Sequence, residues 1–319
     1  MSAQIMTVCG LVAPAELGVT DAHSHVWIEP VEGANLAGLI LDDVSAIATE
    51  LQDYKAQGGG AIVDCQPGGV GRNGLQLRTI SEASGVHIIA STGFHLRRYY
   101  PPDAALWSMT IVAAADYFLN EIEYGLQESR DAVSPVYPGV IKIAAELTLA
   151  TSPIALFEAA AAAARLSGLA IEMHTEQGAD VARLLEFFLA QGVPPQQLVF
   201  CHVDKRPDFG LHQELARAGV LLEYDTFVRP KYQPDQNAWP LLRQMIAAGL
   251  AGSVALPTDC ALTSMWLNFG GGPGPAAFLT QVAARLNSLQ VDPNTETDLL
   301  GRNIARRLAV AQPELQEKA

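Results

Sequence analysis

Six residues of types that bind metal ions or carry protons stand at or near the ends of segments predicted to be β-strands. They are His23, His25, Lys142, His174, His202 and Asp259. Imidazole nitrogens and carboxylate oxygens are common ligands of divalent cations. In a (β/α)8 barrel, the carboxyl ends of the strands are where the catalytic groups gather. The set therefore indicates a metal-dependent hydrolase, in which a metal-activated water attacks the substrate.

The pair His23 and His25 lies in the segment TDAHSH. Side chains at i and i+2 of a strand point to the same face, so both imidazoles can reach one metal ion. Two ordinary histidines in a polar loop are an equally good interpretation of such a pair when it stands alone. A lone histidine at a strand end, such as His174 or His202, is more often a hydrogen-bonded structural residue. Four histidines at one end of a barrel favour a metal site.

Asp259 ends the last predicted strand, which lies beside the first strand in a closed barrel. A carboxylate there can bind a metal ion and also accept a proton from bound water. The alternative role for Asp259 is a helix N-cap, a common use of aspartate after a strand.

Lys142 lies in the apolar run GVIKIAAE, where a lysine is costly to bury unless it is paired or modified. One interpretation is an ion pair with Glu146 or Glu172. The other is a carbamate, formed when a desolvated neutral lysine reacts with carbon dioxide. A carbamate is an anionic oxygen ligand that can bridge two cations.

Eight short apolar segments alternate with helical patterns along the chain. The predicted strands are residues 20–25, 61–66, 87–94, 140–146, 169–175, 198–203, 220–227 and 253–259. Predicted helices include residues 42–57, 111–127, 153–166, 181–191 and 241–248. Glycines that suit the left-handed position after a helix are Gly58, Gly85, Gly168, Gly192, Gly219 and Gly249. Continuous apolar runs are typical of parallel strands that are covered on both faces.

This alternation predicts an α/β fold, a single (β/α)8 TIM barrel over residues 1–319. A further helix over residues 295–310 is expected to pack on the barrel exterior. A doubly wound sheet is less favoured, because its first strand usually leads into a glycine-rich phosphate loop. Here the first strand ends in His-Ser-His, and neither glycine-rich run, 58–60 or 270–274, matches a nucleotide-binding motif.

The charge and the cysteines narrow the range of partners and compartments. The chain has 20 basic and 34 acidic residues, which gives a net charge of −14 and argues against nucleic acid or acidic membranes as partners. The cysteines Cys9, Cys65, Cys201 and Cys260 show no paired spacing, so we expect free buried thiols in a reducing cytoplasm. The first 18 residues lack the basic and apolar regions of a secretory signal.

The order of an HxH pair, a strand-four lysine, two histidines and an aspartate resembles the phosphotriesterase family of the amidohydrolase superfamily. Similar segments are TVCGLVAPAELGVTDAHSH, DCQPGGVGRN, SGVHIIASTGFH, GVIKIAAE and NFGGGPG, so the resemblance covers nearly the whole chain. Within the family, the chain is most similar to lactonase-like members.

The resemblance implies a site with two divalent cations. His23, His25 and Asp259 would hold the more buried cation, and His174 and His202 the more exposed one. Lys142, as a carbamate, would bridge them together with a hydroxide. Zinc is the default for sites rich in imidazole, although manganese, cobalt or iron can use the same ligands.

In this mechanism the bridging hydroxide attacks the substrate, and Asp259 accepts its proton and passes it to the leaving alkoxide. The expected reaction is the opening of a sugar-like lactone. A phosphotriesterase is the alternative enzyme, and a non-catalytic metal-binding barrel is the third. The third would predict lost ligands, yet all six are present. The partner is expected to be a small molecule, with a homodimer as one candidate assembly.

Residues that could bind the substrate follow strands three, six and seven. They are His95, Tyr99, Asp204, Arg229, Lys231 and Tyr232. The last three form a cationic and phenolic cluster suited to an anionic or polyhydroxylated substrate. A solvated loop whose basic residues pair with neighbouring acids is equally compatible with that cluster. Tyr99 or Tyr100 would line the leaving-group pocket, or one of them would pack against the rim.

Asp204 would steer a substrate hydroxyl, hold a metal-bound water, or accept a hydrogen bond from a metal ligand. The segment KYQPD, residues 231–235, is similar to relatives that hydrolyse phosphorylated sugar lactones. Those relatives also carry an arginine and a tyrosine shortly after the strand-eight aspartate. Residues 260–266, CALTSMW, have apolar side chains there instead, which argues against a phosphate-bearing substrate.

Overall fold

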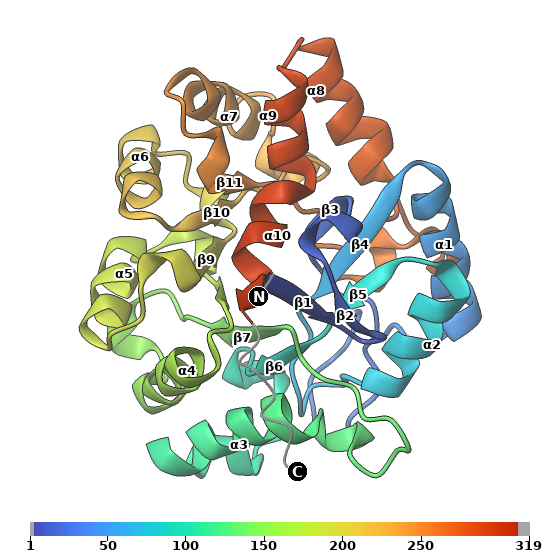
Figure 1. The fold of residues 1–319 in the computed structure, drawn as a ribbon, viewed down its shortest axis with the longest axis vertical. Coiled ribbons are helices and arrows are strands. Elements are labelled where there is room, and N and C mark those ends of the chain that lie inside the picture. Colours follow the sequence, from blue (N-terminus) through green and yellow to red (C-terminus); the bar gives the residue numbers. More distant parts are fainter. Residues whose placement is uncertain (1–2, 312–319) are drawn as a thin grey trace.

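The structure, a computed structural model, describes residues 3–311 of the chain. Its central strands all run parallel, and their order in space follows the order of the sequence (Figure 1). They are β3 (Val19–Ser24), β4 (Gly59–Asp64), β5 (His87–Ile89), β6 (Ser91–Gly93), β7 (Val140–Ala144), β8 (Ile171–His174), β9 (Leu198–Cys201), β10 (Leu221–Glu223) and β11 (Val254–Ala255). This sequential order is that of a barrel and differs from the permuted order of a doubly wound sheet.

The strands form two hydrogen-bonded groups, β3 to β5 and β6 to β11. Only Ala90 separates β5 from β6, so the predicted strand 87–94 is present but interrupted, and it joins the two groups. At the other junction, the Asp259 N–H donates to the His23 carbonyl at 2.9 Å. The last strand segment therefore lies beside the first.

All eight predicted strand segments are present, but several end earlier than expected. The predicted strands 198–203 and 253–259 stop at Cys201 and Ala255. His202 and Asp259 have φ values of 65° and 49°, which a strand cannot contain. The backbone therefore leaves the sheet where these side chains are presented.

Helices surround the strands (Figure 1). They are α1 (Val44–Ala56), α2 (Gly74–Ser84), α3 (Ile111–Tyr124), α4 (Ile154–Ser167), α5 (Val181–Ala190), α6 (Phe209–Ala218), α7 (Ala238–Ala247), α8 (Ala284–Ser288), α9 (Pro293–Thr297) and α10 (Asn303–Leu308). The predicted helix 42–57 begins later because Asp43 is its N-cap and accepts the Ala46 N–H at 3.0 Å. The six glycines predicted to follow helices all have positive φ, between 70° and 106°, as expected.

The C-terminal segment differs from the single exterior helix that was expected. A wider helical turn, Asp298–Arg302, separates α9 from α10. The apolar face of α10, with Ile304, Ala305 and Leu308, packs in one cluster with small residues of the strands such as Ala22 and Ala61. This helix therefore covers the amino-terminal end of the barrel instead of running along its side.

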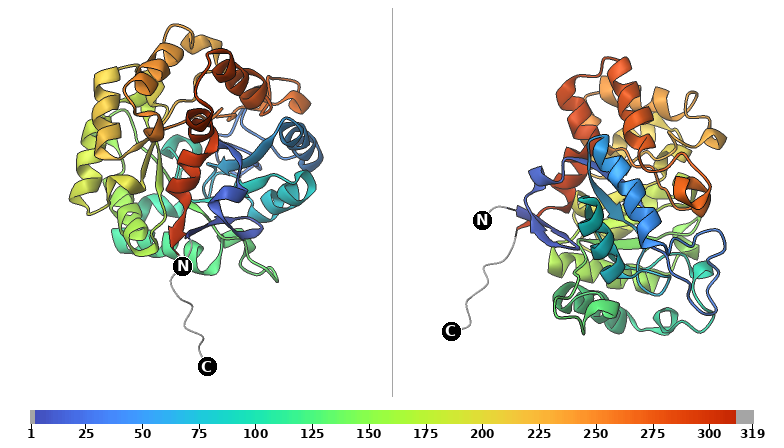
Figure 2. Two further views of the ribbon diagram at one scale, coloured as in Figure 1. Left: turned by 45° about the horizontal axis from the view of Figure 1, so that its top comes forward. Right: turned by 90° about the vertical axis from the view of Figure 1, so that its right-hand side faces the viewer.

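An antiparallel sheet that was not predicted lies at the same end. It consists of β1 (Ala3–Thr7), β2 (Gly10–Val12) and β12 (Val310–Ala311), in the order β12-β1-β2. Figure 2 shows these strands together with α10 on one side of the molecule, and long loops on the opposite side. The end of the barrel that carries the predicted metal ligands is therefore the open one.

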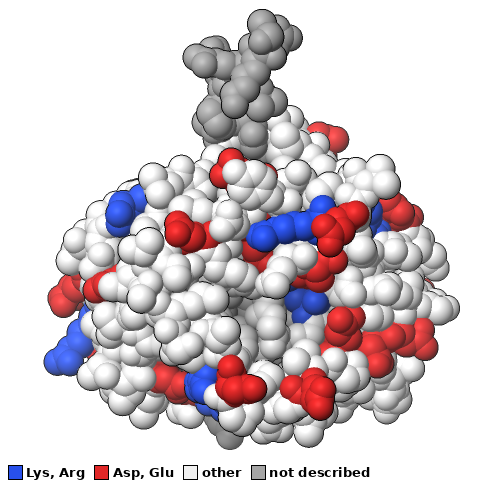
Figure 3. All heavy atoms as spheres, turned by 90° about the horizontal axis from the view of Figure 1, so that it is seen from below, with Lys and Arg blue, Asp and Glu red and all other residues white. Residues whose placement is uncertain are grey.

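Surface charge and helix length bear on the expected partners. The face in Figure 3 shows scattered acidic and basic side chains, and its described residues form no continuous basic area. Within residues 3–311, no helix combines the length and apolarity needed to cross a bilayer.

All four cysteines are free, but Cys9 is exposed, so the expectation of a buried thiol is wrong for that residue.

Candidate functional site

The barrel brings the predicted histidines together at the carboxyl ends of its strands. The His23 and His202 rings lie 4.9 Å apart between centroids, and the His174 and His202 rings 4.7 Å. The His23 and His25 rings are 5.8 Å apart. Asp259 lies between two of them, with Oδ1 3.9 Å from His23 Nε2 and Oδ2 3.7 Å from His202 Nδ1.

Three groups of these side chains have the spacing of metal ligands. In each group the ligand atoms lie within 4.8 Å of one another. The groups are His23, His25 and Asp259; His202, Asp225 and Asp259; and His23, Glu172, Cys201 and Glu223. Every member is buried. The first group consists of the three residues that were predicted to hold the more buried cation.

Two of the predicted ligands stand on a strained backbone. His202 and Asp259 adopt left-handed φ angles, which cost of order 1–3 kcal/mol in residues other than glycine. The backbone of Asp259 is held by its hydrogen bond to the His23 carbonyl. Strain maintained by surrounding contacts is typical of residues whose side chains must point in one direction.

Partners behind the imidazole rings hold them in place. His25 Nδ1 lies 2.7 Å from Gln66 Oε1, and His202 Nδ1 lies 2.5 Å from Asp225 Oδ2. In each ring the acceptor fixes the proton on Nδ1 and leaves Nε2 free to bind a cation. The buried Nε2 atom of His174 lies 3.6 Å from Glu176 Oε2, a little beyond ordinary hydrogen-bond distance. This set of donors fits divalent cations.

Burial keeps the histidines in the form that metals bind. Burial lowers the pKa of His25 to about 4 and lowers the pKa of His23, His174 and His202 as well. The nearby amines add to this effect, Lys142 at His23 and Lys205 at His202. A neutral imidazole is the form with a free lone pair.

Lys142 is fully buried and pairs with Glu172, whose Oε1 is 3.4 Å from Nζ. Glu172, and not Glu146, is therefore the ion-pair partner anticipated from the sequence. Lys142 Nζ also lies 3.3 Å from His23 Nε2 and 3.6 Å from Cys201 Sγ. Burial would lower the pKa of Lys142, but its thiol and carboxylate neighbours outweigh burial and raise it.

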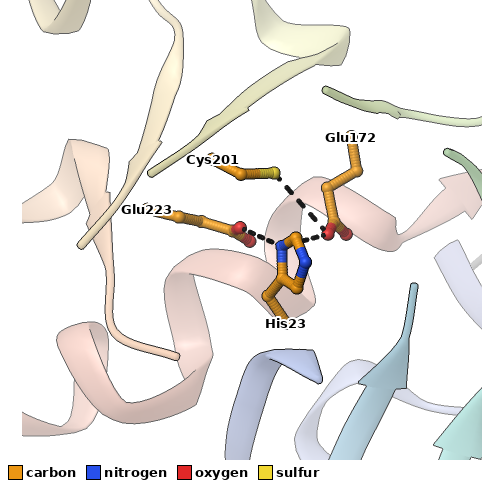
Figure 4. A group of neighbouring side chains, drawn as sticks. All are labelled: His23, Glu172, Cys201 and Glu223. Atoms are coloured by element: carbon orange, nitrogen blue, oxygen red, sulfur yellow. Dashed lines mark hydrogen bonds and ion pairs between the residues drawn. The ribbon is translucent and has the colours of Figure 1, made fainter. Parts of the chain in front are cut away.

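A buried acidic layer lies behind His23 (Figure 4). His23 Nδ1 is 3.0 Å from Glu172 Oε1 and 3.1 Å from Glu223 Oε2. The Cys65 thiol donates to Glu172 Oε1 at 2.6 Å, and Cys201 Sγ is 3.8 Å from the same oxygen. Burial raises the pKa of Glu223 well above its usual range, with a further contribution from Glu172.

Arg229 pairs with the predicted catalytic aspartate. Its guanidinium lies 2.8 Å from Asp259 Oδ2 and also donates to the Asp259 carbonyl. Burial would raise the pKa of Asp259, but Arg229, followed by His202 and His23, holds it well below its usual value. The carboxylate form is therefore the one present at neutral pH.

The remaining predicted substrate residues lie in three different places. His95 and Tyr99 line a cavity together with His25. Lys231 is exposed, and its Nζ lies 4.8 Å from the centre of the Tyr232 ring. Asp204 is buried, and its Oδ2 accepts from the Thr226 N–H at 2.9 Å and from the Thr226 hydroxyl at 2.6 Å.

Sequence reasoning did not assign four side chains that support the histidines: Gln66, Glu172, Glu223 and Asp225. For three of them, the spacing in the sequence already indicates an interior position. Glu172 is two residues before His174, and Glu223 is two residues before Asp225, so the two-residue period of a strand places them on the interior face. Gln66 ends the predicted strand 61–66, but β4 stops at Asp64 and Gln66 lies in the loop that follows.

Comparisons with known proteins agree with this geometry. A sequence model of the phosphotriesterase family matches residues 3–301. A phospho-furanose lactonase of Mycoplasmopsis synoviae is 27% identical over 95% of this chain and 91% of its own length. An N-acetyltaurine hydrolase of Mus musculus is 29% identical over 71% and 72% of the two chains.

The fold has close counterparts among solved structures. A lactonase from Listeria monocytogenes superposes with a TM-score of 0.88 at 22% identity, covering 97% of this chain and 100% of the other. An amidohydrolase from Mycoplasma synoviae gives 0.88 at 25% identity over 98% and 93%. Because the family model spans nearly all of the described residues, the chain belongs to the phosphotriesterase family.

Proposed function

We propose that this chain is a metal-dependent hydrolase that opens lactones. The observation that carries the proposal is the group His23, His25 and Asp259, all buried and with ligand atoms within 4.8 Å of one another. Family membership supports a hydrolase, and the relatives named phospho-furanose lactonase support a lactone as substrate.

His23, His25 and Asp259 would hold one divalent cation, and His174 and His202 the other. The rings of His25 and His202, which Gln66 and Asp225 hold in place, support this assignment. Lys142, converted to a carbamate, would bridge the pair. Bound cations would lower the pKa of water and polarise the substrate carbonyl. Zinc suits this ligand set, and manganese, cobalt or iron are alternatives.

Asp259 is the residue that would carry the proton. Its low pKa keeps it a carboxylate, and Oδ1 faces His23 while Oδ2 is held by Arg229. It can accept a proton at Oδ1 and deliver it to the leaving alkoxide. Arg229 would then orient Asp259 instead of binding the substrate, because its guanidinium is already engaged.

The other residues predicted to bind the substrate would have different roles. His95 and Tyr99 line the cavity beside His25 and are suited to contact a small-molecule substrate. Asp204 supports the loop that follows β10 through Thr226. Lys231 and Tyr232 would act only on a substrate large enough to reach the rim.

A homodimer through the loops at this end stays a proposal.

The test is to compare kcat/KM for a panel of lactones with kcat/KM for the triester paraoxon. We expect lactones to be the better substrates and a chelator to abolish both activities. Asp259→Asn should lower lactone turnover by a hundredfold or more, about the contribution of a general acid or base. Paraoxon turnover exceeding that of every lactone would favour a phosphotriesterase instead.

A further inference from the structure

The barrel closes without regular strand pairing between its last and first strands. Strand β11 ends at Ala255, and within residues 3–311 its ladder joins it to β10 alone. Residues 256–259, which lead from β11 to the predicted ligand Asp259, lie outside any strand. The Leu256 N–H donates to the carbonyl of Leu299, in the turn before α10, at 3.3 Å. The position of Asp259 must therefore depend on contacts other than those of the sheet.

Asp21 supplies such contacts from the first strand. It is fully buried in β3, two residues before His23. Its Oδ1 accepts the Thr258 N–H at 3.0 Å, and its Oδ2 accepts the Thr258 hydroxyl at 2.5 Å. The His23 N–H also donates to Oδ1, at 3.3 Å. One carboxyl group therefore holds the backbone at residue 258 against the backbone at residue 23.

The contact continues into the site at the next residue along the chain. The Asp259 N–H donates to the His23 carbonyl at 2.9 Å. Asp21, His23, Thr258 and Asp259 are thus joined by hydrogen bonds into one group, which we call the closure cluster. The φ of Asp259 is 49°, a strained value that persists only where neighbouring contacts hold it. Arg229 holds the carboxylate of Asp259, whereas the closure cluster holds its backbone.

The first strand is itself irregular at Asp21. The register between β3 and β4 shifts on both sides of this residue. The Asp21 N–H donates to the Tyr54 hydroxyl at 3.2 Å, and that hydroxyl lies 3.1 Å from the Ala61 carbonyl of β4. Tyr54 of α1 therefore fixes the backbone of Asp21, so that its side chain can hold Thr258 in one position.

Accurate placement matters here because the predicted ligands come from two separate strands. His23 and His25 belong to the first strand, and Asp259 follows the last one. Asp259 Oδ1 lies 3.9 Å from His23 Nε2. Residues that bind one ion must be held to within about 0.5 Å of the productive geometry. A carboxyl group that accepts both an N–H and an O–H from one residue fixes orientation as well as distance.

We infer that Asp21 and Thr258 are positioning residues, which hold Asp259 beside His23 and His25 so that one cation is bound by residues from both sides of the barrel closure. The inference rests on the proposed metal-dependent function. Asp21 and Thr258 act through Asp259 and His23, because their own polar atoms already bond to one another.

The first experiment measures the closure cluster in the metal-free protein. Thr258→Val keeps the shape of the side chain and removes the hydroxyl, which leaves Asp21 Oδ2 without that donor. We expect the amides of residues 258 and 259 to exchange hydrogen about tenfold faster than in the wild type. Mass spectrometry with fragmentation to single residues gives the rates. Unchanged exchange at both amides would overturn the inference.

Thr7→Val is the matched control. Thr7 is also buried, and its hydroxyl donates to the Gly10 carbonyl at 2.7 Å in the hairpin at the other end of the barrel. Its loss should leave exchange at residues 258 and 259 as in the wild type. Equal acceleration in the two variants would mean that any lost hydroxyl loosens the fold, and would also overturn the inference.

The second experiment measures zinc affinity by competition with a chelating dye. We expect Thr258→Val to raise the dissociation constant about 10–100-fold, as for other residues that hold metal ligands in place. Thr258→Ser, which restores the hydroxyl, should recover most of the affinity, and Thr7→Val should bind as the wild type does. The visible spectrum of bound Co²⁺, which reports the arrangement of its ligands, should change in Thr258→Val and return in Thr258→Ser.

The outcomes separate this inference from the proposed function. Wild-type affinity and an unchanged Co²⁺ spectrum in Thr258→Val would overturn the positioning role and leave the metal-dependent hydrolase intact. Failure of Thr258→Ser to recover affinity would overturn the role of the hydroxyl in the same way. A folded wild type that binds neither zinc nor cobalt would overturn both the proposed function and the inference.

Discussion

Single residues behind the histidines determine how well the site can bind metal. Glu223 and Glu172 both contact His23 Nδ1, and Glu223 is wholly buried. A buried carboxyl group is costly unless it has hydrogen-bond partners, so its presence needs a compensating role. That role is to fix the proton of His23 on Nδ1, which leaves Nε2 free to bind a cation.

Substituting Glu223 should therefore weaken metal binding. Glu223→Leu removes the acceptor behind His23 and is expected to raise the metal dissociation constant about 10–100-fold, whereas Glu223→Gln, which keeps an oxygen acceptor, should have a smaller effect. Competition with a chelating dye measures the constants. Glu50→Gln is a control, because this buried carboxylate contacts Asn268 away from the histidines. Wild-type affinity in both Glu223 variants would contradict the role.

His212 in α6 makes a separate prediction about pH. Its Nδ1 lies 2.7 Å from the Tyr224 hydroxyl, and burial lowers its pKa to about 4. Between pH 6.5 and about pH 4, His212 is protonated in the unfolded chain but neutral in the folded chain. Its contribution to the free energy of unfolding therefore falls as the pH falls through that range.

The stability advantage of the wild type over His212→Gln should shrink by roughly 2 kcal/mol between pH 6.5 and pH 5. Urea unfolding at a series of pH values gives the two curves. His87→Gln, at the half-buried first residue of β5, should show a weaker pH dependence. Parallel curves for wild type and His212→Gln would mean that His212 titrates normally.

At the scale of elements, close contact between strands positions the lysine. Gly93 in β6 pairs in register with Lys142 in β7. Gly93 has a φ of 112°, and a Cβ there would overlap the Lys142 carbonyl. Strand β6 can therefore approach Lys142 of β7 this closely only because residue 93 has no side chain.

Gly93→Ala should destabilise the protein by about 3 kcal/mol or more, from the strained φ and the overlap together. Gly85→Ala is the matched control: its φ is also positive, but a Cβ there meets nothing within 4 Å, so a cost of only about 1–2 kcal/mol is expected. Urea unfolding at neutral pH compares the two. Equal losses would show that the approach of β6 to β7 tolerates a side chain.

At the scale of the whole molecule, the sequence predicted the strand order and the convergence of the histidines, because both follow from apolar runs and the two-residue period. It did not predict the β1–β2 hairpin or the way α10 covers the barrel end, which depend on contacts between distant segments such as Ala3 with Ala311. It also did not predict that the Arg229 guanidinium pairs with Asp259. Only the folded backbone brings those two loops together.

The most direct test of the two-metal site is elemental analysis of the purified protein after reconstitution with zinc in bicarbonate buffer. The wild type should hold about two metal ions per chain, and Lys142→Ala, checked by circular dichroism for a native fold, at most one, since the bridge between them is gone. A folded wild type that retains no metal would contradict the site. Equal metal content in wild type and Lys142→Ala would contradict the bridging lysine.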